Sequence, residues 1–108
     1  MKDVPQVTVE ELNEELRGDA PPVLLDVREE DELKISKLDY QHHIPVDDLR
    51  DRVDELSLDD DIVVICRTGL RSGNATLFLR ERGFTRVRCM VGGMNEWSER
   101  IDPTMRQY

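Results

Sequence analysis

Long apolar runs and cysteines are both scarce in this sequence of 108 residues. No apolar stretch approaches the roughly 20 residues that a helix needs to cross a bilayer. The start of the chain, Met1 to Pro5, lacks the apolar core of a secretory signal. Two cysteines are too few for a disulfide scaffold. We therefore expect a protein of the reducing cytoplasm that makes no use of a membrane.

Positive charge is also in short supply, since 15 Lys and Arg face 24 Asp and Glu and leave a net charge of -9. This balance argues against a nucleic-acid partner, because binding a phosphate backbone requires cationic neutralisation. The charge is unevenly distributed: residues 1–61 hold 20 acids and 7 bases, whereas residues 62–108 hold 4 acids and 8 bases. Chemistry on an anion is expected in the second half, and the first half is equally well explained as a solvated acidic face.

The remaining composition fits one domain over residues 1–108, with 38% of residues in the hydrophobic set. Continuous apolar strands are predicted at 23–27, 62–66 and 87–91, with a brief extended segment at 42–45. Helical patterns alternate with these strands. The sequence therefore predicts an α/β fold with a parallel sheet covered by helices on both faces.

Four helices are predicted from capping residues, apolar spacing or charge. Thr8 and Glu11 form a capping box. Asp47 is predicted to cap a helix that places Leu49, Val53 and Leu56 on one side. A further helix is expected over residues 72–82, and an acidic first turn over residues 29–32 predicts a short helix.

Cys66 ends the most apolar strand, where ligands bind in open parallel sheets. A thiol there faces the amides and positive dipole end of the following helix, which favour a nucleophilic thiolate. Fixed positive charge and small or hydroxylated residues follow it, namely Arg67, Thr68, Gly69, Leu70, Arg71 and Ser72. The alternative is a buried cysteine that only closes a strand.

The loop length separates two chemistries. Tyrosine-phosphatase sites resemble Cys-x5-Arg, but here four residues separate Cys66 from Arg71. A loop one residue shorter forms a smaller cradle, better sized for one sulfur atom on the thiolate than for a phosphate. A small phosphatase or arsenate-type reductase remains an alternative.

The chain resembles the rhodanese-like sulfurtransferase family over nearly its whole length. The matching pieces are Val23 to Glu29, His43-Ile44-Pro45, Val63 to Ser72, Gly83-Phe84, and Gly92-Gly93-Met94 followed by Trp97. The closing stretch from Trp97 to Tyr108 is similar to rhodanese domains fused to E1-like adenylyltransferases. One segment, residues 36–41, departs from the family pattern because it has no glycine.

The resemblance implies a five-stranded parallel sheet and a persulfide on Cys66. We expect no cofactor and no metal. It implies that Asp26 and Arg28 support the loop, while Arg67 and Arg71 orient a small anionic sulfur donor. The expected partners are a ubiquitin-like sulfur-carrier protein, an E1-like adenylyltransferase or a cysteine desulfurase. A non-catalytic interaction module with the same fold is the rival function.

The other candidates favour structural roles. His42 and His43 are adjacent in an extended segment, so their side chains point to opposite faces and suit one metal ion poorly. Cys89 lies within a strand and is predicted to pack in the core rather than to act as a resolving thiol. Phe78 and Trp97 are expected in the core as well.

Overall fold

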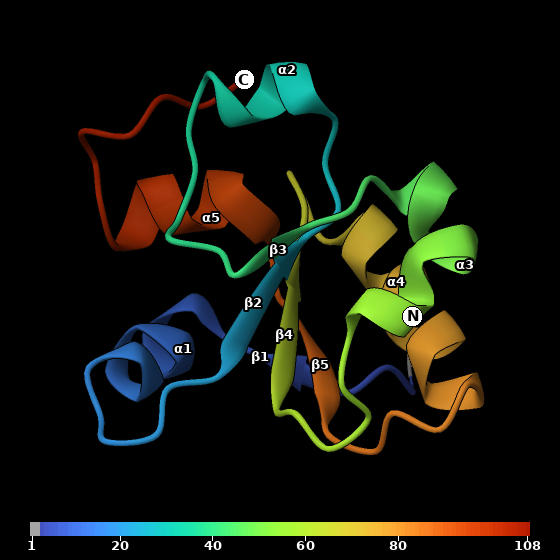
Figure 1. Ribbon diagram of the computed structural model, residues 1–108. Coiled ribbons are helices and arrows are strands. Elements are labelled where there is room, and N and C mark those ends of the chain that lie inside the picture. The colour runs from blue at the N-terminus through green and yellow to red at the C-terminus, as the bar shows by residue number, and fades with distance from the viewer. Residues whose placement is uncertain (1–2) are drawn as a thin grey trace.

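The computed structural model describes residues 3–108, which form a parallel sheet of five strands in the order β1-β5-β4-β2-β3 (Figure 1). The strands are β1 (Gln6–Val7), β2 (Val23–Asp26), β3 (His42–His43), β4 (Ile62–Ile65) and β5 (Val87–Met90). Strand β4 lies at the centre between β2 and β5, and all of its residues are buried. The α/β class and the five-stranded parallel sheet are confirmed.

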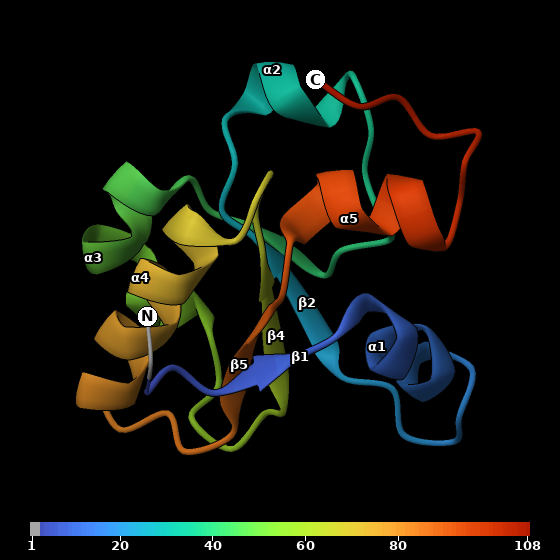
Figure 2. The ribbon, with the colours of Figure 1, turned by 180° about the vertical axis from the view of Figure 1, so that it is seen from behind.

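Helices cover both faces of the sheet, as Figures 1 and 2 show. One face carries α1 (Val9–Leu16) and α5 (Gly93–Arg100), and the other carries α3 (Leu49–Arg52) and α4 (Leu70–Glu81). The short α2 (Glu30–Leu33) lies above the carboxyl edge of the strands, next to the C-terminal end of the chain. This edge is where the strand-end residues of the predicted site meet.

The core has one half on each side of the sheet because side chains alternate along a strand. Ile62, Val64 and Cys66 belong to the half under α3 and α4. Val63 and Ile65 belong to the half under α1 and α5, together with Trp97. The Cys66 side chain is therefore directed toward the α4 side of the sheet.

Helix α4 begins two residues earlier than the sequence predicted. Gly69 is its N-cap and has a φ of 105°, a left-handed conformation that glycine adopts without steric cost. The turn is complete at Gly69, so Arg71 and Ser72 belong to the first helical turn rather than to a loop. The connection after β4 is correspondingly short.

The predicted helix capped by Asp47 is wrong in its local form. Pro45 is extended, and the Asp48 N–H donates to the Pro45 carbonyl over 2.8 Å, which closes a tight 3-10 turn. Only Leu49–Arg52 is α-helical, and a second 3-10 turn follows it. The apolar side is nevertheless as predicted, because Leu49, Val53 and Leu56 all join the core under α4.

Two further segments differ from the sequence prediction or extend it. Strand β1 was not predicted from the pattern, since it has two residues and pairs only with Cys89 and Met90 of β5. In the glycine-free segment 36–41, the Gln41 side-chain oxygen accepts a hydrogen bond from the Leu24 N–H over 2.7 Å. Gln41 thus ties this segment to strand β2.

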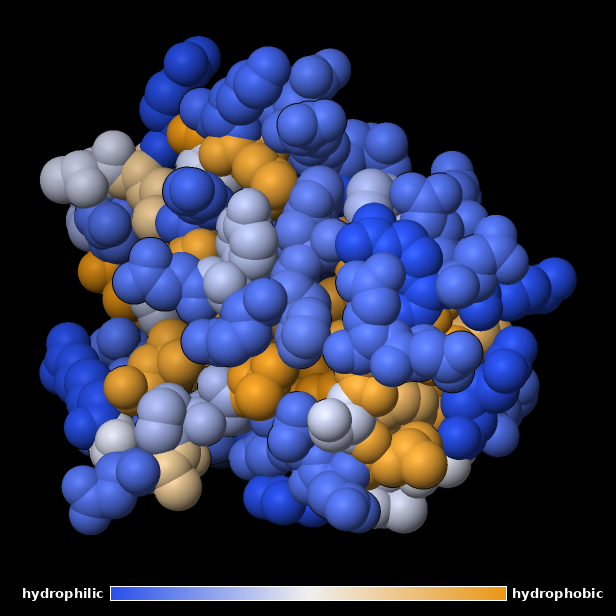
Figure 3. Space-filling view, viewed as in Figure 1, coloured by the Kyte–Doolittle hydropathy of each residue, from blue (hydrophilic) through white to orange (hydrophobic). Residues whose placement is uncertain are grey.

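Hydrophilic side chains dominate the face seen in Figure 3, with apolar patches between them. This agrees with the high share of charged residues, 36% of the sequence. No helix within residues 3–108 is long and apolar enough to span a membrane.

Candidate active site

Cys66 follows the last residue of the central strand and is 1% exposed. The Gly69 N–H donates a hydrogen bond to Cys66 Sγ over 3.0 Å. The Cys66 thiol lies 3.3 Å from Ser72 Oγ, and the Ser72 hydroxyl donates to the Gly69 carbonyl over 3.2 Å. The sulfur is therefore placed at the N-terminus of α4, among groups that stabilise negative charge.

The backbone of the same loop is held by the N-terminus of α5. The Met94 N–H donates to the Cys66 carbonyl over 2.8 Å, and the Asn95 N–H donates to the Arg67 carbonyl over 3.1 Å. Gly93 makes this approach possible, because a Cβ at that position would overlap the backbone of Cys66 and Arg67. Two helix N-termini thus fix the loop from opposite sides.

Both loop arginines lie at the carboxyl edge, and each is already engaged. The Arg71 guanidinium forms two hydrogen bonds with the Glu32 carboxylate of α2, over 2.6 and 2.7 Å. The Arg67 guanidinium lies 5.0 Å from the centre of the Tyr108 ring, within the range of a cation–π contact. Thr68 and Leu70 of the loop are exposed.

The Glu32 carboxylate beside the loop accepts four hydrogen bonds. Besides the Arg71 pair, it accepts from the Glu29 N–H over 2.9 Å and from the Tyr108 hydroxyl over 2.7 Å. These donors, the Arg71 guanidinium above all, lower the pKa of Glu32 to about 2. Glu32 is therefore ionised throughout the physiological range.

Asp26 and Arg28 form a fully buried ion pair at the end of β2, with the Arg28 Nη2 2.8 Å from the Asp26 carboxylate. Arg28 also donates to the Ser36 carbonyl over 2.7 Å and to the Tyr108 hydroxyl over 2.8 Å. The described contacts of this pair connect it to the loop through Tyr108 and Glu32. Burial of such a pair is tolerated because nearly every guanidinium donor is satisfied.

The sequence prediction missed Glu32 and Tyr108 as members of this site. Glu32 appeared only as one acid in the first turn of a short helix, and Tyr108 lies in the tail, 76 residues away. A pattern within one sequence carries no signal that joins residues so distant. The one sequence feature that pointed to Tyr108 is the similarity of the closing stretch to rhodanese domains fused to E1-like adenylyltransferases.

His43, Cys89 and Trp97 make contacts within the fold, and Phe78 lies at the margin of the core. His43 Nε2 lies 2.8 Å from the Arg28 carbonyl. Cys89 is 3% exposed, and burial raises the pKa of its thiol. Trp97 is buried, while Phe78 is partly buried against the core under α4.

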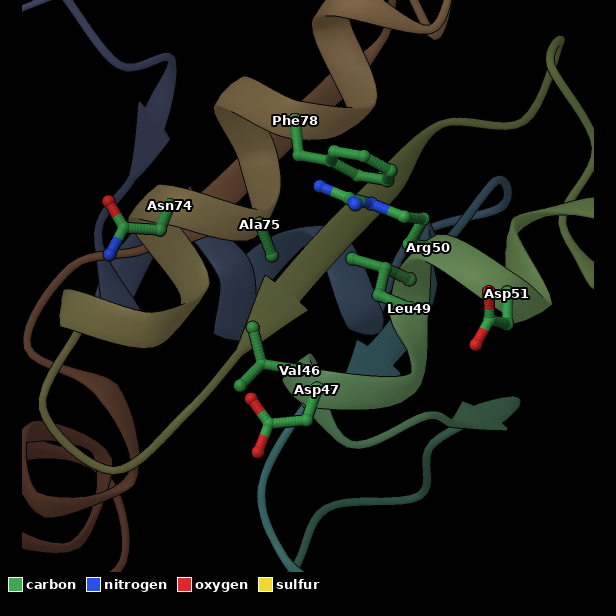
Figure 4. Close-up of a pocket in the computed structure, with 8 residues that line it drawn as sticks. All are labelled: Val46, Asp47, Leu49, Arg50, Asp51, Asn74, Ala75 and Phe78. Atoms are coloured by element: carbon green, nitrogen blue, oxygen red, sulfur yellow. The ribbon is translucent and has the colours of Figure 1, made fainter.

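A cavity of 540 Å³ lies between α3 and α4, away from the Cys66 loop (Figure 4). Its lining combines an apolar floor with a polar rim: Val46, Leu49, Ala75 and Phe78, with Asp47, Arg50, Asp51 and Asn74. A smaller cavity of 270 Å³ adjoins the loop at Thr68 and Gly69 and is also lined by Cys89. The Cys66 loop adjoins the smaller of these two cavities, so the larger volume does not mark the candidate site.

Fold and site together define an α/β protein with a thiol held at the carboxyl edge of a parallel sheet. The chain belongs to the rhodanese-like domain family, whose model matches residues 8–100. Among solved structures it is similar to a rhodanese-related protein from Thermoplasma volcanium, with 32% identity, a TM-score of 0.81 and coverage of 88% of this chain and 91% of that one.

Curated relatives have names from sulfur metabolism. A putative sulfurtransferase, YtwF, from Bacillus subtilis is 32% identical over 94% of this chain and 97% of its own. The chain spans only 54% of a putative sulfur carrier protein, YrkF, from the same bacterium, at 30% identity over 92% of this chain. It spans 20% of the adenylyltransferase and sulfurtransferase MOCS3-1 from Zea mays, at 35% identity over 82% of this chain.

The close approach at Gly93 predicts that Gly93→Ala destabilises the protein. The new Cβ overlaps the loop backbone, and the residue has a φ of 63°, which is strained for alanine. We expect a loss of about 1–3 kcal/mol in the free energy of unfolding, measured by urea titration. Gly18→Ala is the control, because the added Cβ there meets only an ordinary contact at 3.5 Å. Equal losses in both variants would contradict the close approach of Gly93 to the loop backbone.

The hydrogen bonds to Glu32 predict an acid-dependent contribution to stability. Because its pKa is lowered from 4.5 to about 2, the contribution is complete above about pH 4.5 and is lost as the pH falls through about 2. The stability difference between wild type and Glu32→Gln should therefore shrink over this window in urea titrations. Glu30→Gln, which removes an exposed acid of the same helix, is the charge-matched control. A difference independent of pH would show that the carboxylate is not stabilised in the folded state.

The contrasting environments of the two thiols predict selective alkylation. Cys66 Sγ accepts a hydrogen bond from a backbone amide, whereas burial raises the pKa of Cys89. Iodoacetamide at pH 7 should therefore modify Cys66 much faster than Cys89, as measured by peptide mass spectrometry. Equal rates would rule out thiolate stabilisation by the loop.

Proposed function

We propose that this protein carries sulfane sulfur as a persulfide on Cys66 and transfers it to an acceptor. The observation that carries the proposal is the placement of Cys66 Sγ at the N-terminus of α4, with the Gly69 N–H 3.0 Å away. A thiolate and a terminal persulfide sulfur are both anionic, and both are stabilised by such a donor. Membership in the rhodanese-like family supports this chemistry.

The reaction is a double displacement through a covalent intermediate. The Cys66 thiolate attacks the outer sulfur of the donor, a new S–S bond forms, and the donor's own bond to that sulfur breaks. With thiosulfate, sulfite leaves with the electron pair. An acceptor thiolate or cyanide then attacks the terminal sulfur of the persulfide and releases the Cys66 thiolate.

The loop residues have distinct parts in this proposal. Gly69 supplies the amide donor, and the Ser72 hydroxyl turns from the Gly69 carbonyl to the sulfur when Cys66 is ionised. Arg67, Thr68, Leu70 and Arg71 border the path of the donor, while Asp26 and Arg28 hold the neighbouring groups in place. The relatives' names suggest a sulfur-relay setting, with a sulfur-carrier protein, an E1-like adenylyltransferase or a cysteine desulfurase as partner.

The structure favours sulfur transfer over phosphatase chemistry. A phosphatase arginine must bind the phosphate together with the cysteine, but the Arg71 guanidinium forms a two-point ion pair with Glu32. The same loop weighs against a purely structural interaction module, since such a role needs no amide donor at the sulfur.

The decisive variant is Cys66→Ser, which keeps the size of the side chain and removes the nucleophilic sulfur. Thiosulfate:cyanide turnover should fall to the uncatalysed rate, with Cys89→Ser as the matched control that retains activity. Full activity in Cys66→Ser would overturn the proposal, and so would wild-type hydrolysis of an aryl phosphate faster than sulfur transfer.

A further inference from the structure

The charges beside the Cys66 loop are largely paired, although the sequence had suggested a cationic site for an anion. Arg71 is neutralised by Glu32, and Arg28 by Asp26. Among the described side chains in these contacts, Arg67 is left without a carboxylate partner, and the Tyr108 ring lies against it. A doubly charged donor therefore meets one uncompensated cation instead of two.

Tyr108 holds this arrangement together. Its hydroxyl donates to Glu32 Oε2 over 2.7 Å and accepts from Arg28 Nη1 over 2.8 Å. Its backbone is bound by Asn95 of α5, whose side-chain amide donates to the Tyr108 carbonyl over 3.3 Å. The tail thus joins α5, the buried Asp26–Arg28 pair and the Glu32–Arg71 pair (Figure 1 shows the tail beside α2).

We propose that Glu32 and Tyr108 determine which donors the loop accepts, by keeping Arg71 in an ion pair. Persulfides of thiols with little net charge are then preferred over the thiosulfate dianion. This inference rests on the proposed function, because it assigns a donor class to the same cysteine. Glu32 and Tyr108 act through Arg71 and Arg67, so both are positioning residues.

The reaction with the preferred donor balances without a further reagent. The Cys66 thiolate attacks the terminal sulfur of R–S–SH, the Cys66–sulfur bond forms, and the donor's S–S bond breaks. The thiolate of R leaves with the electron pair, and the persulfide proton, where the donor carries one, stays with the transferred sulfur or passes to water. The transferred sulfane sulfur keeps its oxidation state, so the step needs no oxidant or reductant.

Electrostatics gives the expected size of the effect. An unpaired guanidinium attracts a dianion, and the high effective dielectric of a partly exposed site keeps this attraction modest. Glu32→Gln should therefore raise the rate constant for thiosulfate about tenfold. A donor with no net charge gains little from the same change.

The experiment measures the second-order rate constant for the gain of one sulfur by the full chain, using thiosulfate and the persulfide of cysteamine in parallel. Cysteamine persulfide carries an ammonium and an ionised persulfide and has no net charge. The variants are Glu32→Gln and Tyr108→Phe, which keeps the ring over Arg67 and removes the hydroxyl. Glu15→Gln is the matched control, because Glu15 forms a two-point pair with Arg88.

The inference predicts that Glu32→Gln raises the thiosulfate-to-persulfide ratio of rate constants about tenfold. Tyr108→Phe should raise it by a smaller factor, and Glu15→Gln should leave it unchanged. An unchanged or lowered ratio in Glu32→Gln, with sulfur still gained by Cys66, would overturn the inference alone. Equal slowing with both donors in the variants would show a structural role and also overturn it. Failure of the wild type to gain sulfur from either donor would instead overturn the proposed function.

Discussion

The site depends on one constraint: backbone amides at the N-termini of two helices hydrogen-bond to a single short loop. Helix α4 directs the Gly69 amide to Cys66 Sγ, and α5 directs its first amides to the Cys66 and Arg67 carbonyls. These contacts consume backbone donors that have no partner within their own helices. The sulfur therefore receives a fixed polar environment from groups that are ordered before any donor arrives.

A second set of contacts extends this order from the core to the surface. Asp26 ends a central strand next to β4 and binds Arg28 in a fully buried pair. Arg28 binds Tyr108, and Tyr108 binds Glu32, which holds Arg71 in the first turn of α4. Apart from the Asp26–Arg28 pair, each link joins groups from distant parts of the chain, so the loop charges depend on the whole fold. The uneven charge had suggested that the site belongs to the second half of the sequence alone. Glu32, from the acidic first half, nevertheless binds Arg71 beside the loop.

Much of the fold could be predicted because strong local signals agree with the tertiary structure. The apolar runs of β2, β4 and β5 and the capping box at Thr8 are as expected, since each depends on neighbours in sequence. Strand β1 was missed because two residues are too few to show a hydrophobic period. Its pairing with β5 depends on residues far away in the sequence. The Asp47 cap failed because Pro45 and a tight turn set the local backbone instead.

The same division holds within the site. Cys66 and its loop could be located because strand, turn and helix follow one another directly. The pairing of Arg71 with Glu32 and the position of Tyr108 could not be, since they arise only when α2, α4 and the tail meet at one edge. Peptide-resolved mass spectrometry after exposure to a sulfane-sulfur donor tests most directly whether Cys66 carries the sulfur. We expect one added sulfur on Cys66, removed by dithiothreitol, with Cys89 unmodified. Sulfur on Cys89 alone, or on neither thiol, would contradict the proposed role of Cys66.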